Sequence, residues 1–200
     1  MYLVAKFQAG KSILWHAAAS SVSIAGIQLS KADSASAVYA TARQDEKCDF
    51  AVKELGATAA FNTETSNWSE EVLKATNGKG VDIIIDFVGA PYFQQNLAAI
   101  AKDGVIVHLG FMGGMELPAG TNIGPLIMKR VSIIGSTLRS RDEEYQAKLR
   151  DQLVEHALPR FKDKRFKLFI EKVLPWEQIQ DAHQLMEDNK TKGKVICTIS

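Results

Sequence analysis

The sequence predicts an α/β protein with a doubly wound parallel sheet, followed by a short C-terminal strand–helix–strand unit. Short apolar runs alternate with segments whose apolar residues recur at helical spacing, which is typical of a parallel sheet with crossover helices. Residues 81–88, VDIIIDFV, are almost continuously apolar, as in a central strand covered on both faces. Charged residues at 162–164 mark a change in composition, beyond which the pattern starts again. We therefore expect one unit in residues 1–162 and a second in residues 163–200.

The best organised stretch is residues 11–31, KSILWHAAASSVSIAGIQLSK. It predicts a strand over 12–16, a turn of small residues over 17–21 and then a helix. Four helical residues at i, i+3, i+4 and i+7 are expected to face the sheet: Val22, Ala25, Gly26 and Leu29. Such a unit opens the Rossmann fold, in which the helix N-terminus offers N–H groups and a positive dipole end to the pyrophosphate of a dinucleotide.

The turn lacks the glycine fingerprint of that fold, G-x-G-x-x-G, and carries Ser20, Ser21 and Ser23 instead. An α/β protein without a cofactor can carry the same kind of turn, so the turn alone leaves both alternatives open. A residue other than glycine in a left-handed turn costs about 1–2 kcal/mol, and its Cβ limits the approach of pyrophosphate. A serine hydroxyl can instead donate to phosphate oxygens. We expect cofactor binding to be weakened rather than abolished.

The other elements of the first unit follow in order. Strands are predicted at residues 35–41, 58–61, 81–88, 105–109 and 131–136, with residues 102–104 turning the chain before the fifth strand. Helices are predicted from Asp45, Asn67, Pro91 and Asp142, and the first of these is expected to bury Cys48, Ala51, Val52 and Leu55. Asp45 and Asn67 suit N-cap positions, Glu70 completes a capping box, and Gly56 suits a helix end. The helix over 142–161 is expected to bury Tyr145, Leu149 and Leu153.

The second unit is predicted as a strand over 166–173, a helix opened by Pro175 and a strand over 194–199. The helix is expected to turn Ile179, Ala182, Leu185 and Met186 inward. Its two strands have no obvious sheet to join within the chain. We therefore expect exposed strand edges and a tendency to associate.

Composition excludes several classes of function. The 200 residues are 46% hydrophobic and carry a net charge of +1, which gives no field for nucleic acid. The two cysteines, Cys48 and Cys197, cannot build a metal cluster alone. No apolar run approaches the roughly 18 residues of a membrane span. The alanine-rich N-terminal run is interrupted by Trp15 and His16, so we do not interpret it as a signal peptide and expect a cytoplasmic protein.

Six pieces of the chain stand in the order and spacing of a known family: WHAAASSVSIAGIQL, KELGATAAFN, GKGVDIIIDFVG, HLGFMGG, GSTLRSRDEEY and NKTKGKVI. On these pieces the chain resembles the medium-chain dehydrogenase/reductase superfamily, and within it the NADPH quinone oxidoreductase branch (zeta-crystallin-like and p53-inducible quinone reductase type). The resemblance implies a zinc-independent transfer of hydride from nicotinamide to a quinone or enone. It also implies homodimers that pair through the sixth strand. The family's N-terminal GroES-like domain, on which the C-terminal tail packs in the family, has no counterpart here.

The resemblance implies a set of cofactor-binding positions and no catalytic acid or base. The positions are Ser20, Ser21, Val22, Ser23, Ala42, Arg43, Lys47, Thr63, Val88, Gly110, Phe111, Leu138, Arg139 and Lys192. Thr63 stands where the family tends to carry tyrosine. Residues 110–125, rich in glycine and proline, are a candidate functional loop, and a flexible crossover is the alternative.

The end of the second strand bears on the choice of cofactor. An NAD site would place Asp or Glu there for the ribose 2′-hydroxyl, whereas this chain has Ala42, Arg43 and, one turn later, Lys47. The positive charges of Arg43 and Lys47 suit the 2′-phosphate of NADPH. The alternative is that the two residues are solvated charges at the start of a helix. His16 and His108 are expected to be core histidines, and Asp86 a cap for nearby backbone. The alternative to an enzyme is a truncated, non-catalytic dinucleotide-binding or interaction protein.

Overall fold

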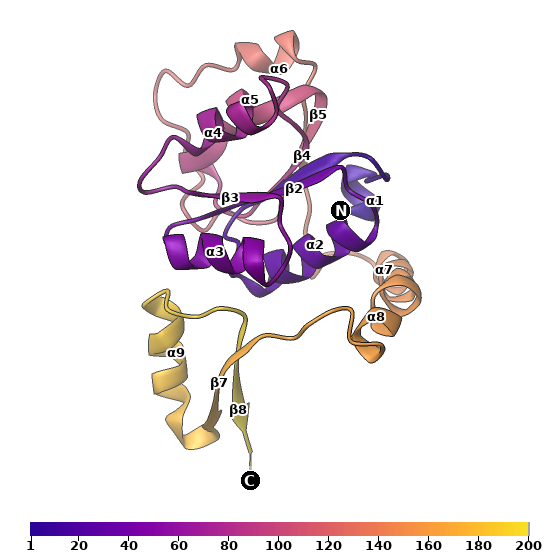
Figure 1. Cartoon of the computed structure of the whole chain (residues 1–200), viewed down its shortest axis with the longest axis vertical. Helices are drawn as coiled ribbons and strands as arrows, with labels where there is room; N and C mark the ends of the chain where they lie inside the picture. Colours follow the sequence, from indigo (N-terminus) through magenta and orange to yellow (C-terminus); the bar gives the residue numbers. More distant parts are fainter. Residues whose placement is uncertain (200) are drawn as a thin grey trace.

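A six-stranded parallel sheet forms the larger part of the molecule, in a computed structural model that describes residues 1–199 (Figure 1). The strands lie in the order β3-β2-β1-β4-β5-β6, and every neighbouring pair is parallel. Their bounds are β1 (Ser12–Trp15), β2 (Ala37–Ala42), β3 (Ala59–Asn62), β4 (Val81–Asp86), β5 (Ile100–His108) and β6 (Ser132–Gly135). Strand order reverses between β1 and β4, which makes that point the topological switch of a doubly wound sheet. The predicted fold class is confirmed.

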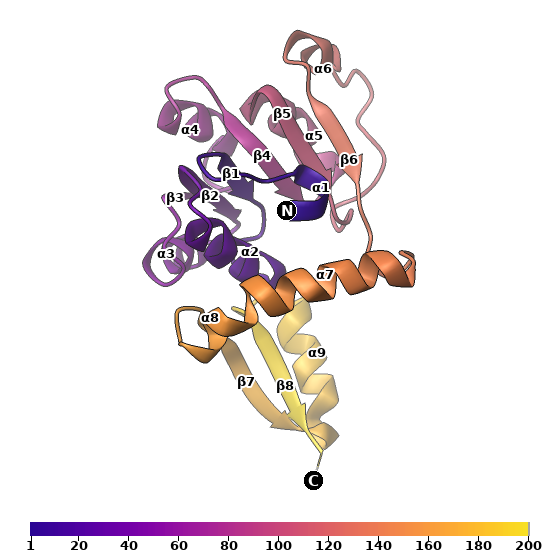
Figure 2. The same cartoon turned by 90° about the vertical axis from the view of Figure 1, so that its right-hand side faces the viewer.

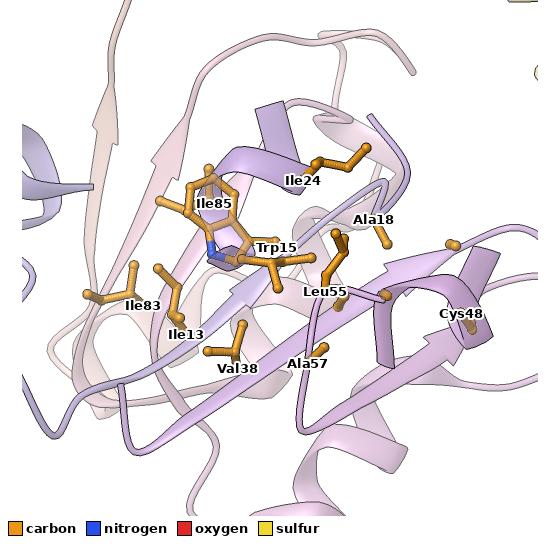
Figure 3. Packing of buried hydrophobic residues seen from close by; sticks show 14 of the residues in the cluster. Ile13, Trp15, Ala18, Ile24, Val38, Cys48, Leu55, Ala57, Ile83 and Ile85 are labelled. Atoms are coloured by element: carbon orange, nitrogen blue, oxygen red, sulfur yellow. The ribbon is translucent and has the colours of Figure 1, made fainter. Parts of the chain in front are cut away.

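Helices cover both faces of the sheet, and each face has its own core. On one face α1 (Tyr2–Ala5), α2 (Ser21–Ala32) and α3 (Asp45–Lys53) pack on strand residues that include Ile13, Trp15 and Val38 (Figure 3). On the other face α4 (Trp68–Ala75), η1 (Ala90–Tyr92) and α5 (Phe93–Ala99) lie over residues that include Leu14 and Ile84. Because successive strand side chains alternate between faces, a strand buried on both faces must be apolar throughout.

The buried face of α2 differs from the predicted one. Of the four residues expected inward, Gly26 is buried and Leu29 is half-buried, but Val22, at 52%, and Ala25 are exposed. Ser23, Ile27 and Ser30 are buried instead. The reason is the Trp15 indole: a Cβ on Gly26 would lie 2.3 Å from its ring atoms. The indole Nε1 also donates to the Ser30 hydroxyl at 3.1 Å. The bulky Trp15 side chain therefore packs where α2 presents the small residues Gly26 and Ser30.

Two helix starts differ in detail from the prediction. Gln44, not Asp45, holds the N-cap position of α3, and no side chain caps that helix. Asn67 does occupy the N-cap of α4, but its amide donates to the Glu70 carboxylate at 2.7 Å instead of forming a capping box with backbone. In α3, Val52 is 39% exposed, whereas the other three residues expected inward are buried. Gly56 has the left-handed φ of +74° expected after a helix end.

Strand β5 is longer than predicted, because residues 102–104 continue it as an irregular segment with Asp103 at a φ of +60°. The Asp103 N–H donates to the Lys129 carbonyl at 2.7 Å, which holds this segment against the end of α6 (Gly124–Met128). The Lys129 ammonium in turn donates to three carbonyls at the end of α5, those of Leu97, Ala98 and Ile100. A cation at a helix C-terminus satisfies free carbonyls and opposes the negative dipole end.

The helix predicted over 142–161 is two helices, α7 (Glu143–His156) and α8 (Leu158–Lys162). Pro159 stands in the first turn of α8, where the missing N–H costs nothing, and so it begins a new helix. No residue of α7 is fully buried, and Leu153 is 44% exposed, contrary to the prediction. Figure 2 shows α7 crossing between the six-stranded sheet and the C-terminal unit.

The C-terminal unit contains β7 (Ile170–Pro175), η2 (Trp176–Gln178), α9 (Ile179–Glu187) and β8 (Lys194–Thr198). The expectation that its strands lack a partner is wrong: β7 and β8 pair in parallel, with Val173 opposite Ile196 and Leu174 opposite Cys197. The helix between them supplies the crossover that parallel strands need. Ala182 is buried as expected, but Met186 is 63% exposed. Among the described residues, no helix has the length and hydropathy needed to cross a membrane.

Candidate dinucleotide site

The predicted site residues follow the carboxyl ends of all six strands of the main sheet. Residues 20–23 come after β1, residues 42–47 end β2 and begin α3, and Thr63 follows β3. Val88 follows β4, Gly110 and Phe111 follow β5, and Leu138 and Arg139 follow β6. In a parallel sheet these ends share one edge, which is where ligands bind in open α/β folds. The topology therefore brings thirteen of the fourteen predicted positions to one edge, and Lys192 reaches it from the C-terminal unit.

The turn between β1 and α2 is well ordered by its own hydrogen bonds. Ala17 has a left-handed φ of +48°, and Ser20 is the N-cap of α2, its hydroxyl accepting from the Ser23 N–H at 3.2 Å. The Ser20 carbonyl accepts the first helical bond, from the Ile24 N–H at 2.9 Å. The N–H groups of a first helical turn have no carbonyl within the helix, so they and the positive dipole end suit an anion.

The three serine hydroxyls donate inside the chain. Ser20 donates to the Ser23 hydroxyl at 3.1 Å, and Ser23, fully buried, donates to the His16 carbonyl at 2.6 Å. Ser21 donates to the Gly193 carbonyl at 3.2 Å. Of the two alternatives for these serines, the hydroxyl–phosphate contact is disfavoured by this geometry, because each donor already has an acceptor. A bound pyrophosphate would face the backbone N–H groups of the turn.

A buried polar chain runs beneath the switch point. His16 Nδ1 lies 2.7 Å from the Thr41 hydroxyl and its Nε2 lies 2.8 Å from the Asn96 amide oxygen. The Asn96 amide nitrogen donates to Asp86 Oδ2 at 2.7 Å. That assignment makes Nε2 of His16 the donor to Asn96. In the neutral imidazole, which a lowered pKa favours, Nδ1 then accepts from the Thr41 hydroxyl. Burial lowers the pKa of His16, against the opposing effects of the Asp86 charge and the Asn96 hydrogen bond.

Asp86 ends β4 and organises the turn that follows. Its Oδ1 accepts from the N–H groups of Val88 at 2.6 Å and Gly89 at 3.1 Å, as the sequence predicted for a backbone cap. His108 Nδ1 lies 3.5 Å from Asp86 Oδ2, and its ring stacks on Phe111 with centroids 5.3 Å apart. Both histidines are buried, as expected of core histidines. Sequence reasoning missed Asn96, whose only signal is a polar residue on the buried side of a predicted helix.

On the β5–β6 side of the switch point the edge is hollowed. A pocket of about 410 Å³ is lined by residues 108–111, 135–137, 140 and 141. It contains two of the predicted positions, Gly110 and Phe111, while Leu138 and Arg139 lie beside its lining. Gly89 is held closely here, since a Cβ on it would lie 2.7 Å from both the Gly114 carbonyl and the Phe111 ring. This side has room for a ring system next to apolar and hydroxyl side chains.

On the β1–β2 side the basic residues have different surroundings. Arg43 is exposed and its guanidinium forms no hydrogen bond or ion pair within residues 1–199. Lys47 is only 6% exposed and donates to the Asn189 carbonyl at 2.5 Å. Burial lowers the pKa of Lys47, and the nearby Arg43 charge adds to that effect. Lys192 pairs with Glu46 at 2.5 Å. Thr63 keeps a buried hydroxyl that has no partner in the described chain.

A parallel sheet in this order, with a helix N-terminus at its switch point, defines a Rossmann-like protein of the nucleotide-binding class. Residues 21–155 match the model of the family described as zinc-binding dehydrogenase. The chain belongs to that family and, with it, to the medium-chain dehydrogenase/reductase superfamily. The resemblance inferred from the sequence is confirmed.

Several relatives extend this assignment. The chain is 31% identical over 193 residues to quinone oxidoreductase-like protein 2 of Bos taurus, covering 96% of this chain and 54% of that protein. A crystal structure of an NAD-dependent alcohol dehydrogenase superposes with a TM-score of 0.82 at 31% identity, covering 98% and 53%. A quinone oxidoreductase of Pseudomonas syringae gives 0.75 at 25% identity, covering 96% and 57%. The chain spans about half the length of the relatives it matches.

Proposed function

We propose that this chain is the NADPH-binding part of a zinc-independent oxidoreductase that reduces a quinone or an enone. The observation that carries the proposal is the single sheet edge that gathers the α2 N-terminus, Arg43 and the pocket beside Phe111. Family membership supports oxidoreductase chemistry, and the name of the bovine relative supports the quinone class. Zinc has no part in the proposal because the quinone oxidoreductase branch, which the sequence resembles, transfers hydride without it.

The residues of the edge fit an extended dinucleotide. The free N–H groups at the start of α2 suit the pyrophosphate, and the pocket between the ends of β5 and β6 suits the nicotinamide half. The bound cofactor would supply hydride, while the chain supplies placement and electrostatics. Asp86 fixes the N–H groups of Val88 and Gly89, and the stacked pair His108 and Phe111 closes the pocket wall.

The preference for NADPH over NADH depends on charge at the end of β2. Ala42 is buried and the next residue is the exposed Arg43, so the end of β2 itself carries no carboxylate for a ribose 2′-hydroxyl. The nearest carboxylates, Asp45 and Glu46, follow in the first turn of α3. A guanidinium without an ion-pair partner can bind phosphate through two parallel N–H donors. We place Arg43 in direct contact with the 2′-phosphate. Lys47 and Lys192 stand nearby, with their ammonium groups held by other partners.

Arg43→Ala tests this preference. We expect the wild type to bind NADPH more tightly than NADH in a fluorescence or calorimetric titration. The variant should lose about tenfold or more in NADPH affinity, since a charge-assisted hydrogen bond contributes about 1.5–3 kcal/mol. Its NADH affinity should stay the same. Arg150→Ala, an exposed arginine on α7 paired with Asp151, is the matched control. Equal affinities of the wild type for the two cofactors would contradict the preference.

Turnover is tested separately from binding. Oxidation of NADPH in the presence of a quinone, followed at its absorbance maximum, should depend on both substrates if the chain is itself active. Saturable NADPH binding without oxidation would instead support the second reading, a dinucleotide-binding protein without activity of its own.

We also propose a homodimer and a cytoplasmic location. The dimer is supported by β6, which pairs only with β5 among the described strands and exposes three of its four residues. The location is supported by Cys48 and Cys197, which are free thiols, as is usual in a reducing compartment.

A further inference from the structure

The turn of residues 189–193, between α9 and β8, lies against the proposed cofactor edge. Figure 1 shows this end of the C-terminal unit directly below α3. Asn189 and Gly193 both have left-handed φ, at +54° and +90°, so the chain reverses tightly there. A Cβ on Gly193 would lie 2.2 Å from the Phe169 carbonyl oxygen, and therefore only glycine fits. We call residues 189–193 the tail turn.

Four polar contacts join the tail turn to the starts of α2 and α3. The Gly193 N–H donates to the Ala19 carbonyl at 3.0 Å, and the Gly193 carbonyl accepts from the Ser21 hydroxyl at 3.2 Å. The Asn189 carbonyl accepts from the Lys47 ammonium, and Lys192 pairs with Glu46. The backbone N–H and the carbonyl of Gly193 are thus both bonded to the turn that would face the pyrophosphate.

The serine at position 21 has a role here that glycine does not offer. Its hydroxyl is a direct link between the dinucleotide turn and a residue 172 positions later in the chain. Lys47 acts in the same way from α3, because its ammonium is buried and already bonded to the tail turn. The Lys192–Glu46 pair is largely exposed on the carboxylate side, at 75%, and exposed pairs contribute little. Ser21 and Lys47 are therefore the stronger fastenings.

We propose that Ser21 and Lys47 are positioning residues that fasten the tail turn to the cofactor edge, so that dinucleotide binding and docking of residues 163–199 are coupled. This inference deepens the proposed function and rests on it for the ligand half. A dinucleotide that orders the start of α2 also orders the two groups bonded to Gly193, the Ala19 carbonyl and the Ser21 hydroxyl. By linkage, the factor by which a bound dinucleotide favours docking of the tail turn is also the factor by which the docked tail turn raises the affinity for the dinucleotide.

The fastening is tested first without cofactor. Amide hydrogen exchange in residues 189–199 should be about three- to tenfold faster in Ser21→Ala than in the wild type, the range expected for one lost hydrogen bond. Ser21→Thr keeps the hydroxyl and should restore slow exchange. Lys47→Met should accelerate exchange at least as much, whereas Lys53→Met, an exposed lysine of the same helix, should not. Unchanged exchange in both Ser21→Ala and Lys47→Met, with the fold intact by circular dichroism, would overturn the fastening.

The coupling is tested by titration. Saturating NADPH should slow exchange in residues 189–199 of the wild type, and Lys47→Met should weaken NADPH and NADH binding by the same factor. A loss confined to NADPH would make Lys47 a direct ligand of the 2′-phosphate and would overturn its positioning role. A wild type that binds neither cofactor would overturn the proposed function, and the exchange rates without cofactor would still decide the fastening.

Discussion

At the scale of single residues, the buried polar chain of His16, Asn96 and Asp86 joins the two halves of the proposed site. Asp86 holds the turn after β4, and the carbonyl of His16 holds Ser23 in the turn after β1. Buried polar groups of this kind are costly unless each is satisfied. Here His16, Asn96 and Asp86 all have hydrogen-bond partners within the described chain. The Nδ1 atom of neighbouring His108 is buried there without a hydrogen-bond partner.

The neutral His16 predicts a pH dependence of stability. Burial lowers its pKa from 6.5, so at acidic pH the unfolded chain binds a proton there that the folded chain does not. The free energy of unfolding should therefore fall as pH drops below about 6.5, by at most about 1.4 kcal/mol per pH unit for one proton. Urea unfolding of the wild type and His16→Gln between pH 5 and pH 8 measures this.

In His16→Gln the dependence should be weaker, because the imidazole at position 16 is gone while the titratable groups that face it, Asp86 and His108, are unchanged. The other histidines are common to both proteins and cancel in the difference. Parallel stability curves for the two proteins would show that His16 titrates alike in the folded and unfolded chain.

At the scale of elements, the packing of α2 on β1 sets the position of the proposed site. Gly26 lets the helix approach the Trp15 ring, and Ser30 accepts the hydrogen bond of the indole nitrogen (Figure 3 labels Trp15 in this core). Close approach of helix and strand fixes where the first turn of α2 points its N–H groups. The geometry of the proposed anion-binding end is thus decided by a contact on the buried side of the same helix.

Gly26→Ala should destabilise the protein, although alanine is the better helix former. Overpacking of a tight contact costs about 1–3 kcal/mol, whereas the gain in helix propensity is about 1 kcal/mol. We expect a net loss near 1 kcal/mol, measured as a lower urea midpoint with an unchanged slope. In Trp15→Phe, which has a smaller ring, the same substitution should cost less. A stabilised Gly26→Ala protein would show that the ring moves aside freely.

At the scale of the whole molecule, α8 and the chain that leads into the C-terminal unit are joined to the helices α2 and α3 of the larger unit. Lys167 and Gln28 exchange two hydrogen bonds, of 2.8 and 3.2 Å, and Arg160 pairs with Asp33. Phe169 packs on the edge of Phe50, with ring centroids 4.8 Å apart. The unit nevertheless leaves large apolar side chains exposed, such as Leu168 at 76% and Ile199 at 84%. Exposed apolar surface of this kind marks an interaction site or a tendency to associate.

The proposed dimer is tested at the free edge of β6. Light scattering or sedimentation of the wild type should give twice the monomer mass of 22.0 kDa. Ile133→Lys places a charge on a strand residue that is 38% exposed, and charged residues on an edge strand oppose pairing with a second copy. The variant should be monomeric with unchanged circular dichroism. A monomeric wild type, or a variant that stays dimeric, would exclude β6 as the interface.

The sequence was sufficient for the elements and their order, because the signals that specify them act over a few residues. Apolar periodicity separated strands from helices, and Gly56 ended a helix as its left-handed φ requires. The family resemblance supplied the fourteen predicted site positions. Twelve of them follow strand ends and Ala42 ends β2, and parallel pairing brings these thirteen to one edge. Apolar periodicity did not divide α7 from α8, whose break at Ala157 comes just before Pro159 in the first turn of α8.

By itself the sequence determined the doubly wound sheet, which follows from local pattern and chain order, and the family, which follows from the six motifs. Only the tertiary structure decided which face of α2 is buried and what the polar side chains bond to. Lys47 meets Asn189 across 142 residues, Ser21 meets Gly193 across 172, and His16 meets Asn96 across 80. A buried donor must find an acceptor, but packing of the whole chain selects which acceptor comes within reach. No local pattern contains that choice.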